Sequence, residues 1–401
     1  MTSVEFTAYN KNLMTFPSFA DATGFMDFGA ECAKAIGSPP GRAWEGCYSP
    51  IRPIGIIGYY TMPHFFTDDP VTLNYIILMM NLLVFLSMVA VMGWVMAHDP
   101  GFQPLRKSSL SGTAKAFLFL GVLFLFLGHL PVTLADLPAN ALFVMAMGVG
   151  YGILFSQKAE IHPLRYCLLG LLAAGSTLMK QNFIVFGGLL GLVVTAFDAH
   201  TRGISHLIKK STLFLLGFSL VLIQFLYIYS HSGDFFLFER KEANIFSANM
   251  TRETVELVAY TVPIQSAYHV NVTDEVNDLT IFVLKVYSGI FRIEIPVYLG
   301  SMEKSHPPNW TPRAGEYVKM YLLVGMLFLW LLFGSFYGPK SLRVACLIAL
   351  GYVVFSALWH HTEYRYYLFP RLVLWITTTY WIFKGLILGA RKLNYGNKIQ
   401  V

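Results

Sequence analysis

Charged residues are scarce in this sequence. Asp, Glu, Lys and Arg together make up 13% of its 401 residues, which is about half of their share in an ordinary soluble domain. Hydrophobic residues make up 55%. A disordered chain has the opposite composition, with few hydrophobic and many charged residues, so that class is excluded. The same scarcity of charge argues against a water-soluble globular enzyme.

Several widespread functional motifs are also absent. The sequence contains no His-Glu-x-x-His metal motif, no Gly-x-Ser-x-Gly nucleophile elbow, no Gly-rich phosphate-binding loop and no paired Cys-x-x-Cys motifs. These absences argue against the familiar classes of hydrolase and against ATP-driven pumps. Internal repeats, which many transporters have, are absent as well.

Long apolar segments are the main feature that the sequence does have. A bilayer core about 30 Å thick requires roughly 20 mainly apolar residues per helix. Nine segments approach or reach that length: 73–97, 113–131, 139–156, 164–177, 182–197, 212–229, 318–337, 342–359 and 367–388. We therefore predict an all-α polytopic membrane protein with about nine transmembrane helices.

The positions of the basic residues predict the orientation in the bilayer. Lys and Arg concentrate in short cytoplasmic loops, and here they concentrate on one side, at Arg106, Lys107, Lys158, Arg165, Arg202, Lys209, Lys210, Lys340, Arg343, Arg391, Lys392 and Lys398. The carboxyl terminus is then cytoplasmic and, with nine spans, the amino terminus is outside. Because sidedness accounts for the net charge of +6, no nucleic-acid partner is predicted.

This orientation divides the chain into four parts. An outer-face segment at 1–72 precedes a transmembrane module at 73–230, and an outer-face loop at 231–317 precedes a second transmembrane module at 318–401. Amphipathic helices are expected in both outer parts. Three Asn-x-Ser/Thr sequons, which agree with a lumenal or extracellular side, lie in the second loop, at Asn249, Asn271 and Asn309.

The outer parts contain two apolar stretches that we do not expect to span. The stretch 54–66 is too short to cross the bilayer, so we predict a re-entrant or surface-lying element there. The stretch 279–299 is longer, but Lys285 and Arg292 share one helical face, which favours an interfacial amphipathic helix. Cys32 and Cys47 also fall in the outer region, where either a disulfide or two free thiols are compatible with the sequence.

The segment 164–197 is too long for one transmembrane helix and too short for two. Its break lies at Lys180-Gln181-Asn182. Two short helices that meet at a polar tip require that tip to be hydrated or buried in protein, because charge and free backbone groups cannot face lipid. We therefore expect a functional role for this tip.

Ionisable residues inside or near the spans are few, and each is a functional hypothesis. The predicted topology places all of them at the outer ends of helices: His129, Asp136, Lys180, His360, His361, Glu363, Arg365 and Arg371. Carboxylates and cations at an outer membrane surface suit the transfer of a group from a lipid phosphate. Such a reaction needs a base for the acceptor and positive charge for the departing phosphate.

Five stretches resemble motifs of the GT-C superfamily of integral membrane glycosyltransferases, which includes protein mannosyltransferases and aminoarabinose transferases. Their order and sidedness carry the resemblance, which extends over nearly the whole chain. The stretches are Phe-Ala-Asp-Ala-Thr-Gly-Phe-Met-Asp-Phe-Gly-Ala at 19–30, Tyr-Ser-Pro-Ile-Arg-Pro-Ile-Gly-Ile at 48–56, Leu-Ala-Asp-Leu-Pro at 134–138, Leu-Met-Lys-Gln-Asn at 178–182 and His-Thr-Glu-Tyr-Arg-Tyr at 361–366.

The resemblance implies roles for the matching residues. Asp21 would be the general base that deprotonates an acceptor hydroxyl, and Asp27 is the alternative base. Asp136 would help to build the acceptor or metal site, although an acid beside Pro138 also suits a helix start. The donor would be bound by Lys180, Arg365, Arg52, His361 and Glu363, with the cations Lys180, Arg365 and Arg52 on the lipid phosphate.

The expected function is therefore an inverting hexosyl- or pentosyltransferase. It would move one sugar from a polyprenyl-phosphate donor to a hydroxyl of a glycan, lipid or protein acceptor. The reaction would occur on the non-cytoplasmic face, in the periplasm for a bacterial inner membrane or alternatively at the endoplasmic reticulum membrane. No cofactor is certain, and a divalent metal ion between Asp21 and Asp136 remains open.

Two other classes remain open, a flippase for a lipid-linked glycan and a structural subunit without catalysis. GT-C enzymes begin with a membrane helix ahead of the first outer loop, and no apolar span precedes Asp21 in this sequence. A shortened chain, a misassigned start and a loop held by other means are the three explanations.

Overall fold

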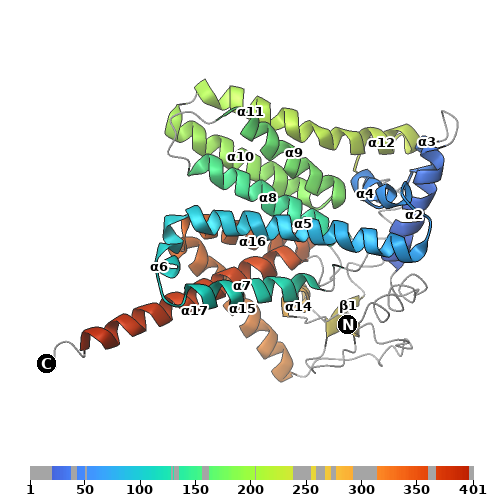
Figure 1. The fold of residues 1–401 in the computed structure, drawn as a ribbon. Helices are drawn as coiled ribbons and strands as arrows, with labels where there is room; N and C mark the ends of the chain where they lie inside the picture. Colours follow the sequence, from blue (N-terminus) through green and yellow to red (C-terminus); the bar gives the residue numbers. More distant parts are fainter. Residues whose placement is uncertain are drawn as a thin grey trace. The chain divides into compact units, whose positions relative to one another are not determined.

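The computed structural model describes residues 20–37, 43–49, 52–127, 130, 135–155, 162–203, 205–237, 254–258, 267–271, 277–291, 314–359 and 367–396. These residues are mostly helical (Figure 1). The chain divides into two compact units. Unit 1 comprises Met1–Met92, Leu127–Phe246 and Pro296–Met302, and unit 2 comprises Gly93–Phe126, Ser247–Ile295 and Glu303–Val401.

Unit 1 is built from helices of very different lengths. In chain order they are α2 (Ala20–Ile36), α3 (Ala43–Gly46), α4 (Ile54–His64), most of α5 (Pro70–His98), α8 (Asp136–Leu154), α9 (Leu164–Met179), α10 (Phe183–Arg202), α11 (Ser205–Phe218), the 3-10 turn η4 (Ser219–Val221) and α12 (Leu222–Ser232). Figure 1 shows α8, α9, α10 and α11 side by side, and α9 and α10 each contact the other three. Gly233, in the left-handed conformation that glycine adopts without strain, ends α12.

Helices α9 and α11 are in close contact, and glycines make it possible. A Cβ atom at Gly170 would lie 2.2 Å from the carbonyl O of Phe214. In return, a Cβ atom at Gly217 would lie 2.2 Å from the carbonyl O of Cys167. Each glycine therefore faces the backbone of the other helix, an arrangement typical of helix pairs in membranes.

Replacing Gly170 by alanine is expected to destabilise unit 1, because the added methyl group can be accommodated only by separating two helix backbones. Overpacking of this kind costs about 1–3 kcal/mol. Gly188→Ala is the matched control, since a Cβ atom at Gly188 has nothing within 4 Å. Thermal unfolding in detergent should show a lower midpoint for Gly170→Ala alone, and equal midpoints for the two variants would contradict this packing.

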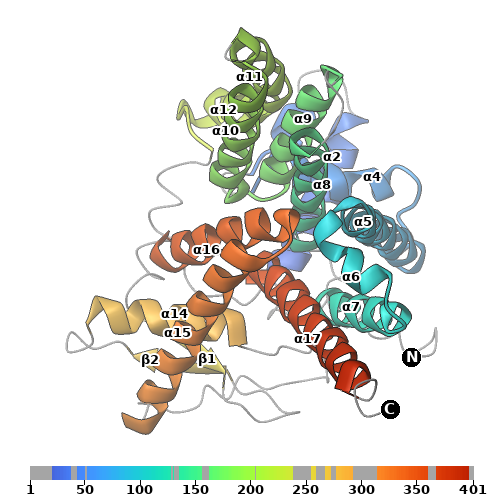
Figure 2. The same ribbon diagram turned by 90° about the vertical axis from the view of Figure 1, so that its left-hand side faces the viewer.

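Unit 2 contains the remaining helices and a pair of strands. They are η2 (Pro100–Phe102), α6 (Gln103–Arg106), α7 (Ser111–Phe126), β1 (Thr254–Val258), β2 (Ala267–Asn271), α14 (Asp278–Phe291), α15 (Ala314–Tyr337), α16 (Lys340–Trp359) and α17 (Leu368–Gly396). Figure 2 shows α14 beside α15 and α16, which it contacts. The strands pair antiparallel, with Thr254 opposite Asn271.

Six helices in the described ranges are long and apolar enough to cross a membrane, so the protein is a multi-pass membrane protein by length and composition. They are Val71–His98, Asp136–Leu154, Leu207–Ser232, Tyr317–Tyr337, Lys340–Leu358 and Leu368–Ala390. A seventh arises if Pro100–Arg106 and Ser111–Phe126, bent by 112°, form one span. The predicted count of nine is not confirmed, because α9 and the apolar part of α10 are shorter than a spanning helix.

The described part of the segment 231–317 differs from the prediction in two respects. It contains β1 and β2, so the described part of the chain is not purely α-helical. The predicted helix in 279–299 is present as α14, which ends at Phe291, but Lys285 does not lie on an exposed polar face. Its side chain is 5% exposed because α14 packs against α15, α16 and β1. Arg292 lies outside the described residues.

Candidate functional site

A buried ion pair joins two of the motifs that the sequence singled out. Asp136 is the first residue of α8, and Lys180 caps the end of α9. The Lys180 ammonium Nζ donates to Asp136 Oδ1. Asp136 is 1% exposed. The predicted break at Lys180 is thus confirmed, and its charge is neutralised inside the protein, as the cost of burying an unpaired charge requires.

The local sequence explains why Asp136 occupies this position. An acidic residue in the first turn interacts favourably with the helix dipole, and Pro138 is tolerated there because the first turn has no partner for its missing N–H. One turn later, Asn140 donates from Nδ2 to the Asp136 carbonyl O at 2.6 Å. Asn140 Oδ1 is buried without a hydrogen-bond partner in the described part of the chain. An acceptor therefore remains available beside the ion pair.

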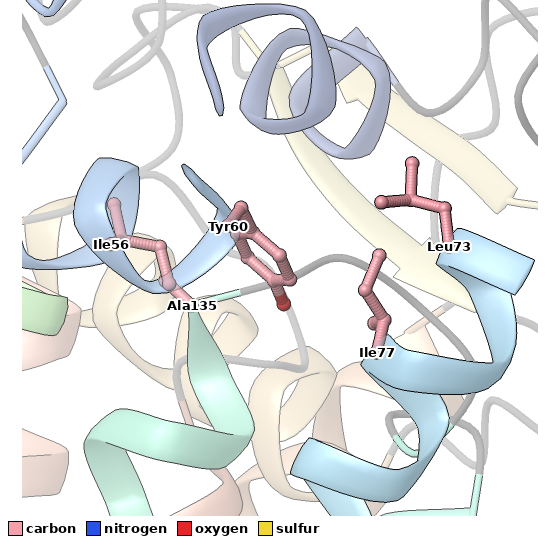
Figure 3. Packing of buried hydrophobic residues seen from close by; sticks show 5 residues of the cluster. All are labelled: Ile56, Tyr60, Leu73, Ile77 and Ala135. Atoms are coloured by element: carbon pink, nitrogen blue, oxygen red, sulfur yellow. The ribbon is translucent and has the colours of Figure 1, made fainter. Parts of the chain in front are cut away.

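An apolar cluster lies against the pair. Ile56 and Tyr60 of α4 pack with Leu73 and Ile77 of α5 and with Ala135 (Figure 3). Met179 also packs against this cluster. Ala135 and Met179 directly precede Asp136 and Lys180, so the cluster places apolar side chains next to both charges. Electrostatic interactions are stronger in such surroundings than in water.

The amino-terminal segment is attached to the same end of α9. A Cβ atom at Gly55 of α4 would lie 2.5 Å from the carbonyl O of Leu178, two residues before Lys180. A Cβ atom at Gly29 of α2 would lie 2.6 Å from the carbonyl O of Tyr60. Helix α2 therefore packs on α4, and α4 packs on the end of α9. This arrangement attaches α4, and through it α2, to the tip at Lys180.

Two glutamines connect this tip to α12 and α4. Gln181 and Gln224 both donate from Nε2 to the Leu237 carbonyl O, at 3.0 and 2.8 Å. Gln224 Oε1 accepts from the Ile54 N–H at 2.8 Å, which satisfies a free amide at the start of α4. Sequence reasoning missed Gln224, although a single amide inside the apolar segment 212–229 was a visible signal.

A disulfide holds the amino-terminal segment together. Cys32 of α2 is bonded to Cys47, which follows α3, so the disulfide alternative is confirmed. The Tyr227 hydroxyl of α12 donates to the Cys47 carbonyl O and accepts from the Ser49 N–H, both at 2.5 Å. These contacts connect the segment around the disulfide to α12.

The other predicted site residues have different outcomes. Asp21 lies in the first turn of α2, and its side chain is outside the described residues. Asp27 is exposed on the same helix. Arg52 is half-buried just before α4, and its N–H donates to Ser49 Oγ at 3.2 Å. His361, Glu363 and Arg365 lie outside the described residues. The structure thus unites Asp136 with Lys180 and leaves the remaining assignments as predictions.

The described residues contain no group of three His, Cys, Asp or Glu side chains that could hold a metal ion. Asp136 of the predicted metal pair forms an ion pair with Lys180, and the side chain of Asp21 lies outside the described residues. A divalent ion between Asp21 and Asp136 stays a prediction. Comparisons of the chain with protein-family models, with curated proteins and with solved structures give no match.

Proposed function

We propose that this protein is an integral membrane glycosyltransferase of the GT-C type, which transfers one sugar from a polyprenyl phosphate to an acceptor hydroxyl. The observation that carries the proposal is the Asp136–Lys180 pair. It joins two stretches that resemble GT-C motifs, at the tip between two short helices. The amino-terminal segment, which contains two more such stretches at 19–30 and 48–56, is attached to the same tip through Gly55.

The proposed reaction is a single inverting displacement. Asp21, or alternatively Asp27, takes the proton of the acceptor hydroxyl as its oxygen attacks the anomeric carbon. The bond between that carbon and the phosphate oxygen breaks, and the polyprenyl phosphate leaves with the electron pair. Arg52 and Arg365 offer guanidinium groups suited to the phosphate, and His361 and Glu363 complete the proposed donor site. Asp136 and Lys180 hold the polar tip at the end of α9 in place.

The acceptor class, the donor sugar and the face of the membrane belong to the same proposal. Transfer would occur on the non-cytoplasmic side, either at a bacterial inner membrane or at the endoplasmic reticulum membrane. The acceptor would approach from water while the lipid tail lies between helices. A metal ion would be needed only if Asp21 and Asp136 bind one together. Sugar transfer that persists after treatment with a chelator would contradict this metal site.

The test uses the purified protein in proteoliposomes with a panel of polyprenyl-phosphate sugars and soluble glycan, lipid and peptide acceptors. We expect at least one donor to lose its sugar to an acceptor, with free polyprenyl phosphate as the second product, measured by mass spectrometry. Donor movement between leaflets is followed in the same vesicles. Donor movement without sugar transfer would favour a flippase. The absence of both activities would favour a structural subunit.

A further inference from the structure

Unit 2 contains a group of buried polar side chains where α14 meets the start of α17. A Cβ atom at Gly289 of α14 would lie 2.2 Å from the ring of Tyr367, so glycine is needed for this contact. Arg371, four residues further on, donates from Nη2 to the Gly289 carbonyl O at 2.5 Å and is itself buried. Gly289 therefore brings Tyr367 and Arg371 directly against α14.

Lys285 lies one turn before Gly289 on the same side of α14 (Figure 2 shows the helix). Its side chain is buried, and no described residue forms a hydrogen bond or an ion pair with it. Burial lowers the pKa of Lys285, because the ammonium loses its hydration. A buried ammonium is costly unless an anion faces it.

After Lys285, the hydroxyl of Tyr367 is the second unused hydrogen-bond donor in this group. This hydroxyl is buried and has no hydrogen-bond partner within the described ranges. Arg371 adds a guanidinium in the first turn of α17, where the helix dipole favours an anion and disfavours a cation. An ammonium, a guanidinium and a phenolic hydroxyl at the start of a helix are the donors that bind a phosphate group.

We propose that Lys285, Tyr367 and Arg371 form a binding site for a phosphomonoester group, which belongs to a lipid headgroup or to free phosphate. The site is built within unit 2, whereas the Asp136–Lys180 pair is built within unit 1. Polyprenyl phosphate, the second product of the proposed transfer, is one such phosphomonoester, and naming it as the ligand rests on the proposed function. The binding of a phosphomonoester at this site does not depend on that function.

The test measures binding to the purified full-length protein in detergent, by microscale thermophoresis. The probes are a polyprenyl monophosphate, phosphatidic acid and inorganic phosphate. Lys285→Met should weaken binding by about 10- to 100-fold, because it removes a charge-assisted hydrogen bond. Tyr367→Phe should weaken it by about 2- to 10-fold, because the lost hydrogen bond is made by a neutral group.

Matched controls separate charge at this site from charge elsewhere. Lys319→Met removes an exposed lysine from α15 in the same unit and should leave binding unchanged. Lys285→Arg keeps the charge and should keep binding. If Lys285→Met elutes as an aggregate in size-exclusion chromatography, the affinity of the conservative variant Tyr367→Phe tests the proposal in its place. Unchanged affinity in Lys285→Met, or in Tyr367→Phe in that case, would overturn the proposal, as would failure of all three probes to bind the wild-type protein.

The arms of the experiment also distinguish the sources of the ligand. Binding of both lipids without inorganic phosphate supports a headgroup site, and equal binding of inorganic phosphate supports a site for the free ion. Lipid binding that depends on Lys285 in a protein that transfers no sugar from any donor would contradict the transferase and support this site.

Discussion

Replacing Lys180 by methionine is expected to lower the free energy of unfolding by about 3–5 kcal/mol. The methionine side chain fills a similar volume, so packing changes little, but Asp136 is then a buried charge without its counter-ion. Removing one partner of a buried pair typically costs this much because the remaining charge stays desolvated. Titration with SDS in mixed micelles measures the loss.

The double variant, with Asp136→Asn added to Lys180→Met, should recover most of the lost stability, because no charge then remains buried. Lys209→Met is the control for removing a lysine, since Lys209 is exposed on α11. A double variant as unstable as Lys180→Met would show that the ion pair does not determine the stability of the tip.

Asp21→Asn is expected to reduce sugar transfer by about 100- to 10,000-fold, the contribution usual for a general base. Asparagine has the same shape as aspartate and cannot accept the proton of the acceptor hydroxyl. Donor binding should therefore be unchanged while the transfer rate falls. The rate is measured under single-turnover conditions with the donor identified by the panel.

Asp68→Asn is the matched control, because Asp68 is an exposed aspartate in the same amino-terminal segment, just before α5. Its transfer rate should equal that of the wild-type protein. Asp27→Asn tests the alternative base on α2, and loss of transfer in that variant alone would move the role from Asp21 to Asp27. Full transfer by both variants would exclude a base on this helix.

Composition and local pattern were sufficient to predict the membrane class and the break at Lys180, and they named the disulfide as one of two alternatives. The break interrupts an otherwise apolar segment with three polar residues, and a polar tip at that depth has to be enclosed. The disulfide involves the only two cysteines in the segment assigned to the outer side. In each case, the deciding information lies within a short stretch of sequence.

The pairings between distant residues could not be predicted in the same way. Asp136 and Lys180 were each singled out, but their ion pair depends on how α8 packs against α9. Lys210 was counted as a cytoplasmic loop residue, yet it is buried on α11 and donates to Asp198 at 2.5 Å. Lys285 was placed on an exposed face because its burial depends on three neighbouring elements.

The disulfide has a consequence for the order in which the protein is assembled. Cys32 and Cys47 can be oxidised only after both have reached an oxidising compartment. Cys47 also accepts a hydrogen bond from Tyr227 of α12, which is made about 180 residues later in synthesis. The disulfide joins residues only 15 apart and does not need α12, whereas the hydrogen bond from Tyr227 must wait until α12 has been made. Docking of the amino-terminal segment onto α12 is therefore a later step than closure of the disulfide loop can be.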